Sequence, residues 1–181
     1  MPRRNRLDDP QPVEPTAPIW RDSLRAGASS GLKTACAAWL SYISAQAVGL
    51  HEGYWAAISA VVVLQSDLPS TRSSGRDRFI GTAIGGVIGW AGASLWHEHA
   101  AIYALCVGLA VLVCALCRVG TAGRLAAVTV SIIVLIPQTA PLWHIALLRF
   151  LEVSWGIVVA LSVAYVGTQF DTLAQRARRA P

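Results

Sequence analysis

Residues 145–170 read IALLRFLEVSWGIVVALSVAYVGTQF, and this stretch decides the fold. Its only charged residues are Arg149 and Glu152, and Leu, Val, Ile and Ala make up most of the remainder. A helix rises about 1.5 Å per residue, so roughly 20 apolar residues cross a hydrocarbon core of about 30 Å. The sequence therefore predicts a membrane-spanning helix over 145–170.

Five more apolar stretches precede this one, each bounded by Pro, Gly, His or charged residues. The chain has 181 residues, of which 54% are hydrophobic and only 14% charged, and its mean hydropathy is +0.49. That is too little charge to cover the surface of a short water-soluble domain. We therefore predict an all-α integral membrane bundle of six helices, whose other spans are 26–50, 54–68, 78–97, 100–117 and 123–137.

The spans divide the chain into three parts: a Pro/Arg-rich cytoplasmic tail over 1–22, a transmembrane domain over 23–170 and a short basic cytoplasmic tail over 171–181. The first tail lacks the apolar core and the small-residue cleavage site of a signal peptide, so we expect the first span to act as an uncleaved anchor. All the cysteines fall in predicted spans, where they are small packing residues, and no metal or other cofactor is expected: Cys36, Cys106, Cys114 and Cys117.

The positions of Arg and Lys predict the orientation, because cytoplasmic loops carry an excess of both. Basic residues stand before the first span, between the second and third, between the fourth and fifth, and after the last, whereas the intervening loops have none. This alternation places both termini in the cytoplasm, across the inner (plasma) membrane. The net charge of +5 then reflects topology and predicts no nucleic-acid partner. The arginines of the two predicted cytoplasmic loops are Arg72, Arg76 and Arg78 in the first and Arg118 and Arg124 in the second.

The two halves of the chain are weakly similar. Gly53–Ser59 can be laid over Gly123–Thr129, a shift of 123 − 53 = 70, and Arg78–Ile80 over Arg149–Leu151, a shift of 149 − 78 = 71. A repeat of three spans must reverse its direction in the membrane, so we predict a 3+3 inverted repeat, as in many transporters.

The apolar runs of the second and fifth spans are also short. Short helices at corresponding positions of the two halves indicate a binding site. Alternatively, the second helix continues through the polar residues Gln65, Ser66 and Asp67, sheltered by its neighbours. Both interpretations put polar atoms inside the bundle.

Two cations fall inside predicted spans away from a cytoplasmic loop. Arg149 stands at the external end of the last span, where the loops otherwise lack Arg and Lys. Glu152 follows one turn later on the same face, so we expect the two side chains to pair. One hypothesis makes Arg149 an anion contact, and the alternative is an interfacial Arg that snorkels to water. Lys33 lies about 13 Å deep if the first helix enters the membrane at Leu24, and should then face a cavity. If 24–32 lies along the interface, Lys33 snorkels instead.

Gly81, Gly85 and Gly89 recur every four residues in the third span, a pattern typical of close helix packing within or between subunits. His97 and His99 flank Glu98, but adjacent residues point in different directions and no third His lies nearby, so we predict a polar turn and no metal site. No catalytic arrangement of Ser, His and acid fits one membrane face, so we expect no enzyme.

Three motifs together resemble a known family. They are Tyr54–Trp55–Ala56 at the start of a helix, Arg78-x-x-Gly81–Thr82-x-x-Gly85 at the start of the next, and Arg149 with Glu152 and Gly156. Over about residues 20–170 the chain resembles the membrane half of the fusaric acid resistance and aromatic acid exporter family, which is related to plant aluminium-activated malate transporters.

The resemblance implies six helices per unit, assembly as dimers or fused pairs, and movement of organic or aromatic carboxylates. Some bacterial relatives are similar to pump components that work with a periplasmic adaptor. The chain ends soon after Phe170, without the large cytoplasmic region of longer members. Because one six-helix unit offers little wall for a pathway, we expect a homo-oligomer, most simply a homodimer, surrounded by membrane lipid.

The leading hypothesis is an exporter or channel for small organic anions. Arg149 and Lys33 would attract the anion, Trp55 and Trp155 would contact its apolar part, and Gln65 and Thr82 would donate hydrogen bonds. If transport is coupled to protons, the proton carriers would be Glu152 and Asp67. The alternative is a non-transporting membrane subunit that packs against a partner protein through Gly81, Gly85 and Gly89.

Overall fold

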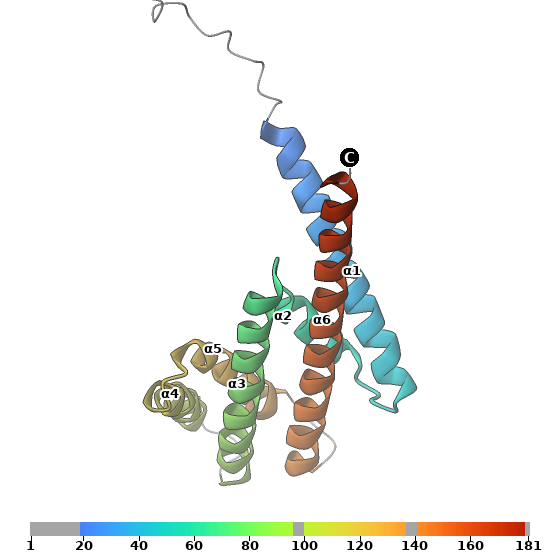
Figure 1. Cartoon of the computed structure of the whole chain (residues 1–181). Helices are drawn as coiled ribbons and strands as arrows, with labels where there is room; N and C mark the ends of the chain where they lie inside the picture. Colours follow the sequence, from blue (N-terminus) through green and yellow to red (C-terminus); the bar gives the residue numbers. More distant parts are fainter. Residues whose placement is uncertain (1–18, 96–99, 137–140, 180–181) are drawn as a thin grey trace, which may run out of the picture.

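The structure, a computed structural model, describes residues 19–95, 100–136 and 141–179. These residues form six α-helices and no strand (Figure 1). The all-α prediction is confirmed, and five of the six helices begin within seven residues of the predicted start. The helices are α1 (Ile19–Ala47), α2 (Tyr54–Val63), α3 (Leu68–Leu95), α4 (Ala100–Leu116), α5 (Gly120–Leu135) and α6 (Leu142–Arg179).

The largest difference from the sequence prediction is the start of α3, which begins at Leu68 instead of residue 78. The Asp67 carboxylate accepts a hydrogen bond from the backbone N–H of Ser70 at 2.9 Å, and so caps the first turn. Pro69 stands in this turn, where its missing N–H costs no helical hydrogen bond. The assignment of Arg72, Arg76 and Arg78 to a loop is therefore wrong, because all three lie on α3.

Helix α2 is short, as its apolar run predicts. It has ten residues, about 15 Å of helix, and ends at Val63, where Leu64 turns the chain into an extended conformation with ψ 122°. The alternative in which this helix continues through Gln65, Ser66 and Asp67 is thus wrong. Among the described residues, Leu142–Phe170 of α6 is the one stretch long and apolar enough to cross a membrane by itself. The other helices are shorter or more polar.

The helices form two groups of three. Helix α6 packs against α1 and α2, whereas α3 packs against α4 and α5. Helices α3 and α6 pack against each other at the centre and run in opposite directions (Figure 1). The third helix of each sequence half therefore packs on the first two helices of the other half.

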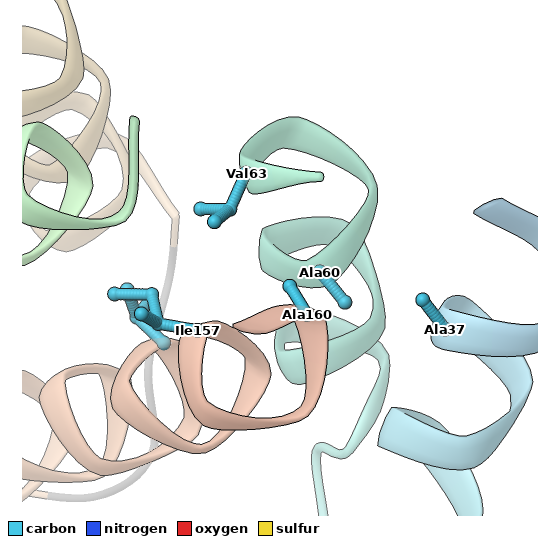
Figure 2. Close-up of a cluster of buried hydrophobic side chains, with 6 residues drawn as sticks. Ala37, Ala60, Val63, Ile157 and Ala160 are labelled. Carbon is cyan, nitrogen blue, oxygen red and sulfur yellow. The ribbon is translucent and has the colours of Figure 1, made fainter. Parts of the chain in front are cut away.

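Small side chains fill the space between the helices of each group, which lets their backbones approach closely. In the α1/α2/α6 group, Ala60 lies between Ala37 and Ala160, with Val63 and Ile157 beside them (Figure 2). The core of the α3/α4/α5 group is made in the same way from Cys106, Ala110, Cys114, Ala122, Ala126 and Val130.

The predicted glycine stripe lies at the contact between α3 and α5. A Cβ atom on Gly81 or Gly85 would approach the backbone of α5 to less than 3.0 Å, and one on Gly89 would stand 3.3 Å from Ile133. On the other side of the molecule, a Cβ on Gly156 of α6 would meet the backbone of α2 equally closely. The stripe is thus covered by α5 of the same chain.

Candidate functional site

Arg149 lies in the second turn of α6 and is 5% exposed. Its Nη1 donates to Glu152 Oε2 at 2.8 Å, the pairing that the one-turn spacing predicts. Its Nη2 donates to the carboxylate of Glu52, which stands between α1 and α2, 97 residues away in the sequence. Arg149 is therefore bound inside the protein by two carboxylates, and the snorkelling alternative is wrong.

Two aromatic residues at the start of α2 complete this arginine cluster. The Arg149 Cζ lies 4.5 Å from the centroid of the Trp55 ring, a cation–π contact. Trp55 Nε1 and the Tyr54 hydroxyl donate to Glu52 Oε2 at 3.2 and 2.7 Å. Burial raises the pKa of Glu52, but the hydrogen bonds from Arg149, Tyr54 and Trp55 and the charge of Arg149 outweigh it, and the net pKa is lowered.

The cluster holds one cation and two carboxylates. Both terminal nitrogens of the guanidinium are engaged, and its Nε is buried without a partner. A substrate anion would have to displace Glu52 or Glu152 to reach Arg149. Sequence reasoning missed Glu52, because a single acid in a loop without cations does not reveal which distant helix it meets.

Lys33 and Gln65 come together in a polar pocket of about 320 Å³ at the break after α2. Four hydroxyl groups and a lysine are unusual neighbours in a chain this apolar, so the pocket suits a small polar or anionic group. The Lys33 side chain also passes close to Gly167 of α6. The lining residues are Ser29, Ser30, Lys33, Thr34, Leu64, Gln65 and Ser66.

Gln65 also lines a second, larger polar groove of about 600 Å³, which lies between the end of α2 and the starts of α3 and α5. On one wall, the Thr121 hydroxyl donates to Asp77 Oδ2 at 2.5 Å. The groove residues are Val62, Gln65, Ser70, Ser73, Ser74, Asp77, Thr121, Arg124, Leu125 and Val128. Gln65 therefore stands between two polar hollows.

Thr82 lies elsewhere, in an apolar pocket of about 390 Å³ between α3 and α6. Aromatic rings form much of the wall, namely Trp90, Trp143 and Phe150. The Thr82 hydroxyl donates to the backbone carbonyl of Arg78 at 2.8 Å. This pocket suits the ring of an aromatic molecule better than its charged group.

The remaining predicted site residues lie apart from these pockets. Trp155 Nε1 donates to the Ser44 hydroxyl at 2.9 Å and so joins α6 to α1. Asp67 is exposed at the start of α3, where the bond from the Ser70 N–H lowers its pKa. The structure thus distributes the predicted residues over several places and unites only Lys33 with Gln65, and Arg149 with Glu152 and Trp55.

Arg78 is the residue whose environment differs most from its prediction. It is 4% exposed, and its Nε is buried without a partner. None of the ion pairs among the described residues includes it. The rings of Phe79 and Phe150, the residues next to Arg78 and Arg149, are in contact with centroids 4.9 Å apart. Both arginines therefore lie near the place where α3 crosses α6.

The model of the fusaric acid resistance protein-like family matches residues 37–163, which run from α1 to α6 and include the arginine cluster and Arg78. The chain belongs to this family. No curated protein and no solved structure matches the chain. The predicted relation to plant malate transporters stays a prediction.

Membership in the fusaric acid resistance protein-like family makes this a membrane-associated, transporter-like protein, in a family of transporters and not of enzymes. Within the described residues, no group of three or more His, Cys, Asp or Glu side chains could hold a metal ion. His97, Glu98 and His99 lie outside these residues.

Proposed function

We propose that this chain transports small organic or aromatic carboxylate anions across a bacterial inner membrane, as an exporter or a channel. The observation that carries the proposal is the pair of arginines buried where the two central helices cross. Charge is expensive inside a membrane protein and marks ion or substrate pathways. A fixed cation lowers the energy of a carboxylate there.

An inverted repeat of three helices and three helices is part of the proposal, and matched close approaches support it. Gly85 meets Ala126 and Thr129 in the way that Gly156 meets Ala56 and Ser59, with 2.9 Å to the second Cβ in both cases. The offsets are 156 − 85 = 71, 126 − 56 = 70 and 129 − 59 = 70. The antiparallel course of α3 and α6 is the one that inversion requires (Figure 1).

A second matched pair involves the first and fourth helices. Gly53 lies against Tyr42 and Ala45 of α1, and Gly123 lies against Val111 and Cys114 of α4. The phenylalanine contact joins equivalent residues, since 150 − 79 = 71. The proposed axis of the repeat thus passes between Phe79 and Phe150.

The proposed membrane orientation has both termini in the cytoplasm. The start of α1 and the end of α6 lie at the same end of the molecule (Figure 1), which fits this orientation. The Lys33–Gln65 pocket would then receive the anion near the break after α2, while the pocket of Thr82 would accommodate an aromatic ring. Trp55 and Trp155, whose indole N–H groups are already bonded, would offer only their ring faces.

Proton coupling, where it operates, would act through the arginine cluster. With Glu52 and Glu152 both ionised, the cluster has a net charge of −1, and binding of one proton would make it neutral. Glu152, at 1% exposure, is the better proton carrier, because Asp67 is exposed and engaged in capping α3. A homodimer is proposed because one unit with a helix as short as α2 offers little wall for a pathway.

Liposomes containing the purified chain test the function. Release of radiolabelled benzoate should exceed that from protein-free liposomes, and Glu152→Gln should weaken the dependence of that release on a pH gradient. Arg72→Gln, an exposed change on α3, serves as the matched control and should behave like the natural chain. Release no faster than from protein-free liposomes would show that the chain does not transport carboxylates unaided.

A further inference from the structure

Arg78 is a buried cation that lacks a counter-ion among the described residues. Its side chain is 4% exposed and its Nε has no hydrogen-bond partner. A guanidinium cannot lose its proton to escape this burial, as a lysine or histidine can. A buried charge without a partner destabilises a protein, so such a group is kept where an external partner supplies the missing charge.

The proposed repeat shows which charges are missing. Its offsets relate Glu52 to Ala122 (122 − 52 = 70), Glu152 to Gly81 (152 − 81 = 71) and Trp55 to Leu125 (125 − 55 = 70). Ala122 and Leu125 lie beside Gly81, since a Cβ on Gly81 would stand 2.7 Å from Ala122 O and 2.9 Å from Leu125 Cβ. In place of both carboxylates that neutralise Arg149, the chain has Ala122 and Gly81, residues without charge, about one turn of α3 from Arg78.

The polar groove gives an anion a way toward this position. Leu125, Thr121, Ser74 and Asp77 line it, and Asp77 is the neighbour of Arg78 on α3. Long side chains on a helix lean toward its N-terminal end, which for Arg78 is the part of α3 that lines the groove. The Asp77 carboxylate accepts from Thr121 and forms no ion pair with Arg78.

We propose that Arg78 binds the carboxylate of a small organic anion that enters this groove, in the place that Glu52 takes at Arg149. This site rests on the proposed function and names its anion contact. Arg149, in contrast, is neutralised from within the chain and holds the region between α1 and α2 against α6. Of the two central arginines, only Arg78 then lacks a carboxylate partner among the described residues.

Isothermal titration calorimetry of the chain in detergent micelles, with benzoate as the probe, tests this site. Benzamide, which has the same ring without the charge, should bind at least tenfold more weakly. Arg78→Gln should raise the Kd for benzoate at least tenfold, whereas Arg78→Lys should retain binding within a few fold and Arg72→Gln should leave it unchanged. A folded Arg78→Gln protein with unaltered affinity, or a natural chain that binds no benzoate, overturns the proposal.

A second variant covers the case in which Arg78→Gln does not fold. Ala122→Glu places a carboxylate at the position equivalent to Glu52, so it should pair with Arg78 and abolish benzoate binding. Retained binding in this variant overturns the site. Failure of the site and of the function are distinguishable: Arg78-dependent binding without benzoate release from liposomes refutes transport alone, while release with Arg78-independent binding refutes the site alone.

Discussion

The α1/α2/α6 group and the α3/α4/α5 group use the same kind of backbone packing but surround their arginines differently. In both, glycines let two helices approach so closely that an added Cβ atom would clash with the facing helix. Around Arg149 this scaffold carries Glu52, Glu152 and Trp55, whereas the positions that the proposed repeat relates to them are Ala122, Gly81 and Leu125. Close packing is thus a property of the scaffold, and charge neutralisation depends on a few side chains placed upon it.

The two groups also differ in a polar contact of their central helices. Trp155 of α6 donates a hydrogen bond to Ser44 of α1, while Ile84 of α3, which the proposed repeat relates to it (155 − 84 = 71), packs on an apolar cluster. In the α1/α2/α6 group the buried cation is paired with carboxylates, whereas among the described residues the buried cation of the α3/α4/α5 group, Arg78, is in no ion pair. The difference teaches that buried charge alone does not mark a binding site. What marks it is buried charge that the chain leaves unbalanced.

Replacing each central arginine in turn should give the largest difference between the two groups. Arg149→Met removes the cation and leaves Glu152 buried without a partner, so we expect a loss of about 3 kcal/mol in the free energy of unfolding. Arg78→Met removes an unpaired buried charge, and should leave that free energy unchanged or raise it. Denaturant titration of both variants in detergent provides the measurement. Equal losses would mean that Arg78 is internally paired after all.

The shared scaffold should respond equally in both groups. Gly85→Ala and Gly156→Ala each insert a Cβ into the backbone of the facing helix, so each should cost about 2 kcal/mol of the free energy of unfolding. Gly86 is the matched control, because a Cβ there meets nothing within 4 Å. Gly86→Ala should stabilise the helix, by up to about 1 kcal/mol. Thermal unfolding that shows only one of the two glycines to be sensitive contradicts the repeat.

The smallest expected effect concerns pH. The folded state lowers the pKa of Glu52 below its ordinary value of 4.5, so its stabilising contribution is present above pH 4.5 and is lost as the pH falls through the lower folded value. Since the Glu52 side chain is 41% exposed, water screens the interaction and we expect about 1 kcal/mol.

Comparison with Glu52→Gln isolates this contribution. The natural chain should lose its advantage over the variant in unfolding experiments below pH 4.5, whereas above that pH the advantage should be constant. An advantage that persists unchanged into stronger acid would show that the Glu52 carboxylate does not carry it.

Local patterns predicted one contact of the arginine cluster. The one-turn spacing of Arg149 and Glu152 places both on one helix face, and the structure pairs them. The glycine spacing in α3 predicted close packing but not its partner, because every apolar helix offers a similar surface. Glu52 was missed, since its role depends on a loop meeting a helix 97 residues later.

By itself, the sequence determined the helical class, the approximate extent of the helices and the short second helix, because apolar runs and their breaks act within a few turns of chain. Only the tertiary structure decided that α3 packs on α4 and α5 while α6 packs on α1 and α2. It also decided that Glu52 meets Arg149 and that, among the described residues, no carboxylate pairs with Arg78. The physical reason is that the neutralisation of a buried charge depends on which distant helices meet around it. Residues adjacent in sequence cannot supply that information.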